Sequence, residues 1–197
     1  MENNRLSLQL AFLTEIDRMK NILRQTLLCD RSRRENDAEH SWHLAMCASV
    51  LFEYAPDSVS LPRVLTMALV HDLIEIYAGD TFAYDEAGYT SKEAREREAA
   101  DRLYAMLPSD QGVYYRALWE EFDAMETPDA RFANACDRLQ PFLNNIATDG
   151  HTWRLGKVRL SQVRRRMAIV CTISPALGEF VEENLRNAVE RGQLIPD

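Results

Sequence analysis

Residues 61–80, LPRVLTMALVHDLIEIYAGD, are the most restrictive segment of the chain, because most of this segment reads as one helix that is apolar on nearly every side. A helix of that kind belongs in the interior of its domain. In its apolar stretch, the side chains that carry charge near neutral pH are His71, Asp72 and Glu75. Buried charges without partners cost roughly several kcal/mol each, so such groups are normally paired or bound to a metal. Their spacing of three and four residues lets them point to one side of a helix. The segment therefore predicts a functional site inside the domain.

Composition limits the class of fold and of partner. The 197 residues suit one domain with a sizeable core, and only 7 Gly and 7 Pro argue against a turn-rich all-β fold. The formal net charge of −8 disfavours a broad nucleic-acid surface, which should be basic. A small anionic ligand held by a local group of arginines is compatible with this charge.

Three features of the sequence predict a cytoplasmic protein with no membrane partner. No apolar run approaches the roughly 20 residues that a membrane-spanning helix needs. The first ten residues, MENNRLSLQL, lack the basic region and the apolar run of a secretory signal. The 4 cysteines form no CxxC pair, as expected for reduced thiols in the cytosol.

The spacing of apolar residues predicts an all-α chain. No series of strands, internal repeat or low-complexity tract is present. Asn36 or Asp37 is expected to cap the second helix, and residues 81–90 are expected to form a loop that faces a substrate. Helices are predicted at residues 6–28, 37–54, 61–80, 91–107, from 108 onward, 128–146, in the basic segment after residue 156, and 175–189.

Four scattered side chains would suit a metal ion if the fold brings them together. His40, His71, Asp72 and Asp137 are two imidazoles and two carboxylates. This mixed nitrogen and oxygen set suits manganese, iron, cobalt, nickel or zinc better than it suits a soft metal bound by thiolates. Only the pair at residues 71–72 is local in the sequence.

The order of these elements resembles that of the HD-domain phosphohydrolases, and most closely their 5′-deoxynucleotidase branch, which is also written as HD-domain-containing protein 2-like. The resemblance rests on ENDAEH at 35–40, HDLIE at 71–75, the Gly-Asp pair at 79–80, and Asp137 in ACDRLQP. It covers about residues 18–143. It implies one compact helical bundle of about seven to nine helices over residues 1–197, with C-terminal helices at 159–190 packed on the motif core.

The resemblance also implies the roles of the metal-site residues. It implies that one divalent transition metal ion is held by His40, His71, Asp72 and Asp137. Glu75 would orient or deprotonate the attacking water instead of binding the metal. Asp80 corresponds to a second carboxylate, which would contact the sugar or assist the leaving group.

Arginines at two positions match those that bind phosphate in the family. Arg24 corresponds to the arginine on the first helix, and Arg33 to the arginine just before the Glu-Asn pair. A forked guanidinium suits a phosphate dianion. Gln25 stands where the related deoxynucleotidases have tryptophan, a departure that bears on the sugar preference and the base preference but not on the hydrolytic centre. Arg164–Arg166 are interpreted as a solvated or interface surface, and His43 as a residue that supports the metal ligands from outside or packs in the core.

The resemblance implies a metal-dependent phosphomonoesterase that acts on nucleoside 5′-monophosphates, with deoxynucleotides preferred, and that forms a homodimer. Two alternatives remain at this point. One is a phosphodiesterase or an alarmone-type hydrolase on the same metal platform. The other is a regulator that binds nucleotides without turnover.

Overall fold

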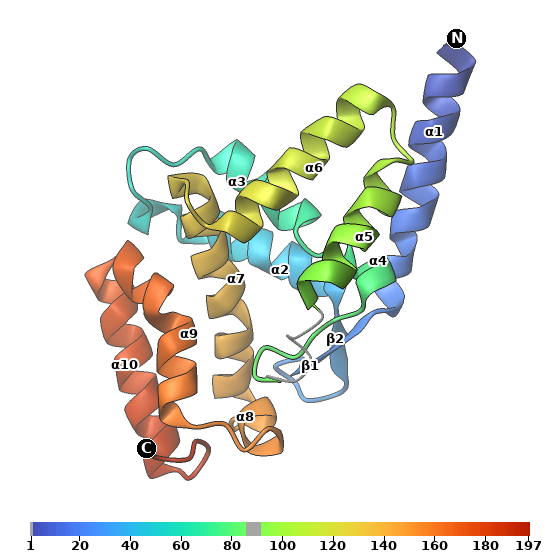
Figure 1. Cartoon of the computed structure of the whole chain (residues 1–197). Coiled ribbons are helices and arrows are strands. Elements are labelled where there is room, and N and C mark those ends of the chain that lie inside the picture. Colours follow the sequence, from blue (N-terminus) through green and yellow to red (C-terminus); the bar gives the residue numbers. More distant parts are fainter. Residues whose placement is uncertain (1, 86–91) are drawn as a thin grey trace.

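The computed structural model describes residues 2–85 and 92–197 (Figure 1). In chain order the elements, with η for a 3₁₀ helix, are α1 (Glu2–Glu15), η1 (Ile16–Asn21), β1 (Leu23–Leu27), β2 (Arg34–Asn36), α2 (Asp37–Val50), η2 (Phe52–Tyr54), α3 (Leu61–Val70), α4 (Glu75–Ala78), α5 (Lys92–Tyr104), α6 (Ser109–Ala124), α7 (Pro128–Ala147), α8 (His151–Leu155), α9 (Leu160–Ile173) and α10 (Pro175–Glu190). The predicted all-α class is confirmed, with a small two-stranded hairpin added. None of the described helices is long and apolar enough to cross a membrane.

Helix α7 lies in the middle of the molecule and contacts α2, α3, α6 and α9 (Figure 1). Its buried side chains belong to two core clusters. Phe132 and Cys136 pack with residues of α2, α3 and α6, whereas Leu139 and Phe142 pack with residues of α9 and α10. Because the helix is packed on both of these sides, the backbone that carries Asp137 is held firmly in place.

The start of α2 is fixed by a capping box. The side chain of Asn36 accepts a hydrogen bond from the backbone N–H of Glu39 (3.0 Å), and the Glu39 carboxylate accepts one from the backbone N–H of Asn36 (3.2 Å). This reciprocal pair satisfies N–H groups that a helix start leaves free. It holds the first turn of α2 in place next to His40, and it confirms Asn36 as the cap.

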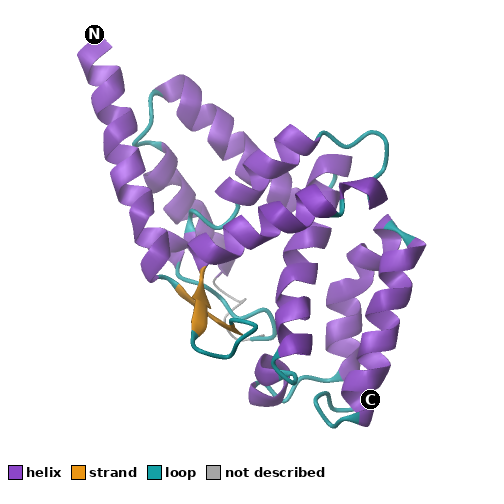
Figure 2. Ribbon diagram, turned by 180° about the vertical axis from the view of Figure 1, so that it is seen from behind, coloured by secondary structure: helices purple, strands orange, loops and turns teal. Residues whose placement is uncertain are grey.

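A β-hairpin replaces the end of the first predicted helix. Leu23–Leu27 forms β1, which pairs antiparallel with β2, with Leu23 opposite Asn36 and Leu27 opposite Arg34 (Figure 2). The hydrogen bond from the Leu28 N–H to the Arg33 carbonyl (3.0 Å) closes the hairpin. The prediction of one helix over residues 6–28 was therefore wrong beyond residue 21.

The stretch after α3 also departs from the single helix that was predicted. Helix α3 ends at Val70, and the backbone then winds more tightly, with hydrogen bonds that reach back three residues. The Leu73 N–H donates to the Val70 carbonyl (3.1 Å), and the Glu75 N–H donates to the Asp72 carbonyl (2.9 Å). Three residues per turn align side chains that are three apart in sequence. The tight turn therefore places Asp72 and Glu75 on one side of the chain.

The C-terminal helices α9 and α10 pack side by side, and α9 packs against α7 (Figures 1 and 2). The chain end returns to the start of α9, because the Leu160 N–H donates to the Ile195 carbonyl (2.9 Å) and the Ile195 N–H donates to the Val158 carbonyl (3.0 Å). This arrangement turns one side of α9 toward the centre of the molecule.

Of the loop predicted at 81–90, residues 86–90 lie outside the described residues, as does Ser91 at the start of the next predicted helix.

Candidate metal centre and active site

Four side chains from α2, the tight turn after α3, and α7 meet in the interior. His40 Nε2 lies 2.9 Å from Asp137 Oδ1 and 3.3 Å from His71 Nε2. His71 Nε2 lies 3.0 Å from Asp72 Oδ2. The two longer separations are 3.7 Å each, from His40 Nε2 to Asp72 Oδ2 and from His71 Nε2 to Asp137 Oδ1. The structure thus gathers the imidazoles and carboxylates that the sequence analysis grouped.

The other ring nitrogen of each imidazole is held by the protein. His40 Nδ1 lies 2.7 Å from the side-chain oxygen of Gln140, and His71 Nδ1 lies 2.9 Å from the carbonyl of Ala68. Each Nδ1 therefore donates its proton to an oxygen, which leaves Nε2 as the nitrogen that faces the centre. Partners of this kind fix the tautomer and the orientation of histidines that bind metals.

Gln140 is itself fixed by two further contacts. Its amide nitrogen donates to Glu35 Oε1 (2.8 Å) and lies 3.0 Å from His43 Nδ1. Gln140 is fully buried, so these contacts leave its side chain little freedom. His43 therefore contacts the side chain that holds His40, which agrees with its interpretation as a residue that supports the ligands or packs beside them.

The donor set fits a divalent transition metal ion. His40 is fully buried and His71 is 4% exposed, whereas the side chains of Asp72 and Asp137 keep 15% and 14% of their surface open. The centre is thus closed on the imidazole side and open on the carboxylate side. Burial acts to lower the pKa of His71, but Asp72 and Asp137 overcome it and raise that pKa to about 10. A cation placed there would replace this proton in neutralising the carboxylates.

Arg24 reaches the same region from β1, not from a helix. Its Nη1 lies 2.9 Å from Asp72 Oδ2 and 3.4 Å from Asp37 Oδ1, and its Nε lies 3.8 Å from Glu35 Oε2. Burial acts to lower the pKa of Arg24, but nearby carboxylates, Asp72 first among them, raise it above its usual value. The guanidinium therefore partly offsets a dense group of negative charges.

Glu75 and Asp37 are buried carboxylates beside this arginine. One oxygen of each, Glu75 Oε2 and Asp37 Oδ2, is buried without a hydrogen-bond partner. Burial raises the pKa of Glu75 well above its usual value, and the charges of Asp72 and Asp37 raise it further. Burial likewise raises the pKa of Asp37 to about 7, with Asp72 as the next cause. A carboxyl group with a raised pKa and an open oxygen can accept and return a proton.

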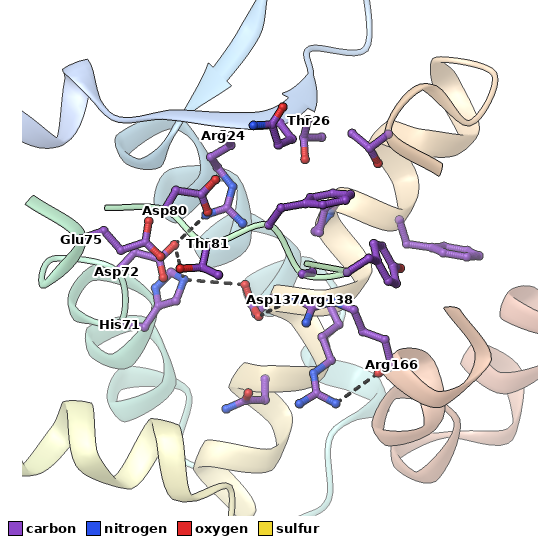
Figure 3. Close-up of a pocket in the computed structure, with 18 of the residues that line it drawn as sticks. Arg24, Thr26, His71, Asp72, Glu75, Asp80, Thr81, Asp137, Arg138 and Arg166 are labelled. Atoms are coloured by element: carbon purple, nitrogen blue, oxygen red, sulfur yellow. Dashed lines mark hydrogen bonds and ion pairs between the residues drawn. The ribbon is translucent and has the colours of Figure 1, made fainter. Parts of the chain in front are cut away.

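A cavity of about 290 Å³ opens onto the centre, next to His71, Asp72 and Asp137. In the view of Figure 3, Glu75, Asp80 and Arg24 lie on one side of the cavity, and Arg138 and Arg166 lie on the other, beyond Asp137. The pKa of Asp80 is raised above its usual value, because the effect of burial outweighs the opposite effect of the positive charge of Arg24. The remaining wall includes the aromatic side chains of Phe82, Tyr84, Phe122, Phe142 and Trp153.

Comparison with known proteins agrees with this geometry. The model of a family described as HD domain matches residues 16–177, which is most of the chain. The chain belongs to the HD domain family. Among solved structures, a predicted metal-dependent phosphohydrolase from Magnetospirillum magnetotacticum MS-1 is 51% identical, with a TM-score of 0.95, over 100% of this chain and 98% of that one.

Curated relatives of this HD domain are more distant. The 5′-deoxynucleotidase HDDC2 of Homo sapiens is 28% identical over 135 residues, which are 68% of this chain and 65% of the human protein. The 5′-deoxynucleotidase hdd1 of Schizosaccharomyces pombe is 25% identical over 110 residues, 54% of each chain. The match thus spans less than two thirds of either relative. A conserved hypothetical protein from Pyrococcus furiosus, 22% identical over 83% of this chain and 98% of that one with a TM-score of 0.55, shares the fold.

One residue assigned to the site from the HD domain resemblance lies elsewhere. Arg33 is on the surface, with about half of its side chain exposed, and its Nη1 donates to Glu39 Oε2 (2.8 Å). It does not line the cavity that opens onto the centre. Arg33 instead pairs with Glu39 at the first turn of α2, where Glu39 is also the second member of the capping box.

Two residues of the site were not assigned from the sequence. Asp37 was considered only as a helix cap, whereas the structure buries it beside Arg24 and Glu75. Arg166 was interpreted as part of an exposed surface, whereas it lines the cavity of this HD domain. Its spacing of three residues from Val163 and of four residues from Val170, both buried on the same helix, is the sequence signal that could have indicated an inward position.

Proposed function

We propose that this chain is a metal-dependent phosphomonoesterase that hydrolyses nucleoside 5′-monophosphates, deoxynucleotides above all, to a nucleoside and phosphate. The observation that carries the proposal is the meeting of two imidazoles and two carboxylates at the wall of a cavity, next to a buried glutamate. Membership of the HD domain family and the names of the relatives support it.

His40, His71, Asp72 and Asp137 would hold one divalent cation, with manganese, cobalt, iron, nickel and zinc as the candidates. When bound, such an ion supplies Lewis acidity toward a phosphoryl oxygen and makes nearby water a stronger acid. The contacts of Gln140 and Ala68 hold the two imidazoles so that their Nε2 atoms would be free to bind the ion.

Glu75 would act as the general base. Its Oε2 atom has no hydrogen-bond partner and is buried beside Asp72, so it is available to take a proton from the attacking water. The water oxygen then forms the new bond to phosphorus, and the bond from phosphorus to the 5′ oxygen breaks. Asp80, on the same side of the cavity, would contact the sugar or return a proton to the leaving 5′ oxygen.

The size and lining of the cavity support a small phosphoester. Its volume of about 290 Å³ is near the lower end of the range for ligand pockets, roughly 300–1,000 Å³. The aromatic wall suits a nucleobase or sugar face. Gln25 lines the cavity at the position where the related deoxynucleotidases have tryptophan, so the test of the proposed preference compares deoxynucleotides with ribonucleotides.

Phosphate release from a panel of deoxynucleoside and ribonucleoside 5′-monophosphates, with added manganese or cobalt, tests the proposal. Cyclic and pyrophosphorylated nucleotides complete the panel, and Asp137→Asn serves as the control for the metal site. We expect the wild-type protein to release phosphate from the monophosphates, and we expect Asp137→Asn to release none. Turnover of only cyclic or pyrophosphorylated nucleotides would identify a diesterase or an alarmone-type hydrolase. Tight binding of nucleotides without release from any of them would identify a regulator.

A further inference from the structure

Arg166 enters the cavity from α9, on the opposite side from Arg24 (Figure 3). The backbone carbonyl of Arg166 accepts a hydrogen bond from Arg138 Nη1 (3.1 Å). Because Arg138 follows Asp137 directly on α7, this bond ties the position of Arg166 to the helix that carries a candidate metal ligand. The guanidinium of Arg166 points toward that ligand, with its Nη2 3.9 Å from Asp137 Oδ2.

The donors of Arg166 are largely unused. Its side chain is 25% exposed, and 3.9 Å is too long for a hydrogen bond. Among the described residues, Asp137 is its one ion-pair partner. The donors of Arg164, on the same helix, are used by contrast. Arg164 lies on the surface and donates two hydrogen bonds to Glu182, at 3.0 and 2.9 Å. A guanidinium with free donors inside a cavity favours an anion as its ligand.

The guanidinium of Arg24, unlike that of Arg166, already contacts several carboxylates of the protein. Its Nη1 already contacts Asp72 and Asp37, so much of its charge is used to balance carboxylates. A phosphate group bound at the centre has three non-bridging oxygens, more than one forked guanidinium can contact in its plane. Asp72 and Asp137 belong to the same centre, and each has one of the two arginines beside it.

We propose that Arg166 binds the phosphoryl group of the substrate directly, on the side of the centre opposite Arg24. This proposal rests on the proposed function, since it names a residue that recognises the phosphate in that reaction. Arg24 then mainly balances the buried carboxylates and holds Asp72, while Arg166 supplies free hydrogen-bond donors to the anion.

Binding of radiolabelled inorganic phosphate to the manganese-loaded full-length protein, measured by equilibrium dialysis, tests this role without any turnover. The variants are Arg166→Ala, Arg166→Lys and the control Arg165→Ala, which removes the same charge from an exposed position on α9. We expect Arg166→Ala to weaken phosphate binding about tenfold or more, as the loss of a charged hydrogen bond does. Arg166→Lys should fall between Arg166→Ala and wild type, and Arg165→Ala should stay within about twofold of wild type.

Manganese content per chain, measured on the same samples, separates binding from positioning. We expect wild-type manganese content in all three variants. Undiminished phosphate binding by Arg166→Ala would overturn the proposal, and so would a loss of manganese, because Arg166 would then act through Asp137. A wild-type protein that binds phosphate but hydrolyses no monophosphate would refute the proposed function while the role of Arg166 in binding an anion still stands.

Discussion

At the scale of single residues, Glu75 is distinguished by its burial and by an oxygen without a partner. We expect Glu75→Gln, which keeps the shape of the side chain, to lower kcat by about 10²- to 10⁴-fold, because the amide cannot accept the proton of the attacking water. Phosphate release from the preferred monophosphate measures this effect. Manganese content and nucleotide binding should stay at wild-type levels, and wild-type turnover would remove Glu75 from its assigned role.

The variant Arg24→Ala tests whether the charge of Arg24 stabilises the buried carboxylates around it. Removing the guanidinium leaves Asp72, Asp37 and Glu35 without their charged partner, and breaking a buried pair in this way typically costs about 3–5 kcal/mol. We therefore expect Arg24→Ala to lower the midpoint of urea unfolding markedly, besides any loss of phosphate affinity. Arg33→Ala is the matched control: its pair with Glu39 is exposed, so the midpoint should barely move. Equal midpoints for the two variants would contradict this account.

The sequence predicts the residues of the candidate metal site better than the residues around them. His40, His71, Asp72 and Asp137 stand out because their types are rare inside apolar segments and match a known order. Asp37 and the surroundings of Arg166 could not be recognised in the same way. A charged residue near the start or on the side of a helix is usually solvated. Only the packing of β1 and α9 against the centre buries Asp37 and brings Arg166 to the wall of the cavity.

At the scale of elements, α5 and α6 meet at Gly112. A Cβ atom at this position would lie 2.6 Å from the backbone carbonyl oxygen of Tyr104, which cannot move away easily. We expect Gly112→Ala to destabilise the protein by about 1–3 kcal/mol through overpacking. Gly178→Ala is the control, because its Cβ would meet Cys171 at an ordinary 3.5 Å, and alanine should stabilise α10 by up to about 1 kcal/mol. Thermal unfolding of both variants measures the two opposite shifts.

The hairpin shows why the boundaries of elements were harder to predict than the fold class. Residues 23–27 continue the apolar spacing of the preceding helix closely enough to read as helical. Their extended conformation depends on pairing with residues 34–36, and an antiparallel partner leaves little trace in the spacing of β1 itself. The long helices lack this problem, since α2 and α7 begin at side-chain caps and α7 and α10 have apolar sides, features that the sequence shows directly.

At the scale of the whole molecule, the candidate ligands join three segments that are distant in sequence. A cation held by all of them binds the folded chain but not the unfolded one, so it should raise the melting temperature in proportion to the logarithm of its concentration. At about 100 times the dissociation constant the gain is about 2.7 kcal/mol. Differential scanning fluorimetry with manganese, and with a chelator, measures it. Asp137→Asn should show little of this shift, and a full shift in that variant would place the ion elsewhere.

We also expect two copies of the chain to associate, as the family resemblance implies. Size-exclusion chromatography with light scattering should then give twice the chain mass of 22.7 kDa at micromolar concentration. A mass that stays at that of one chain across the accessible concentration range would contradict the expected homodimer.

The tight winding after α3 has a practical consequence for anyone who engineers this protein. Three residues of an ordinary α-helix turn the chain by about 300° and not by a full turn, so Asp72 and Glu75 would share a side of the helix but would no longer be aligned. Substitutions that favour a regular α-helix in this stretch should therefore give variants with a higher melting temperature but lower activity. This trade-off between stability and activity would arise from a single turn of backbone.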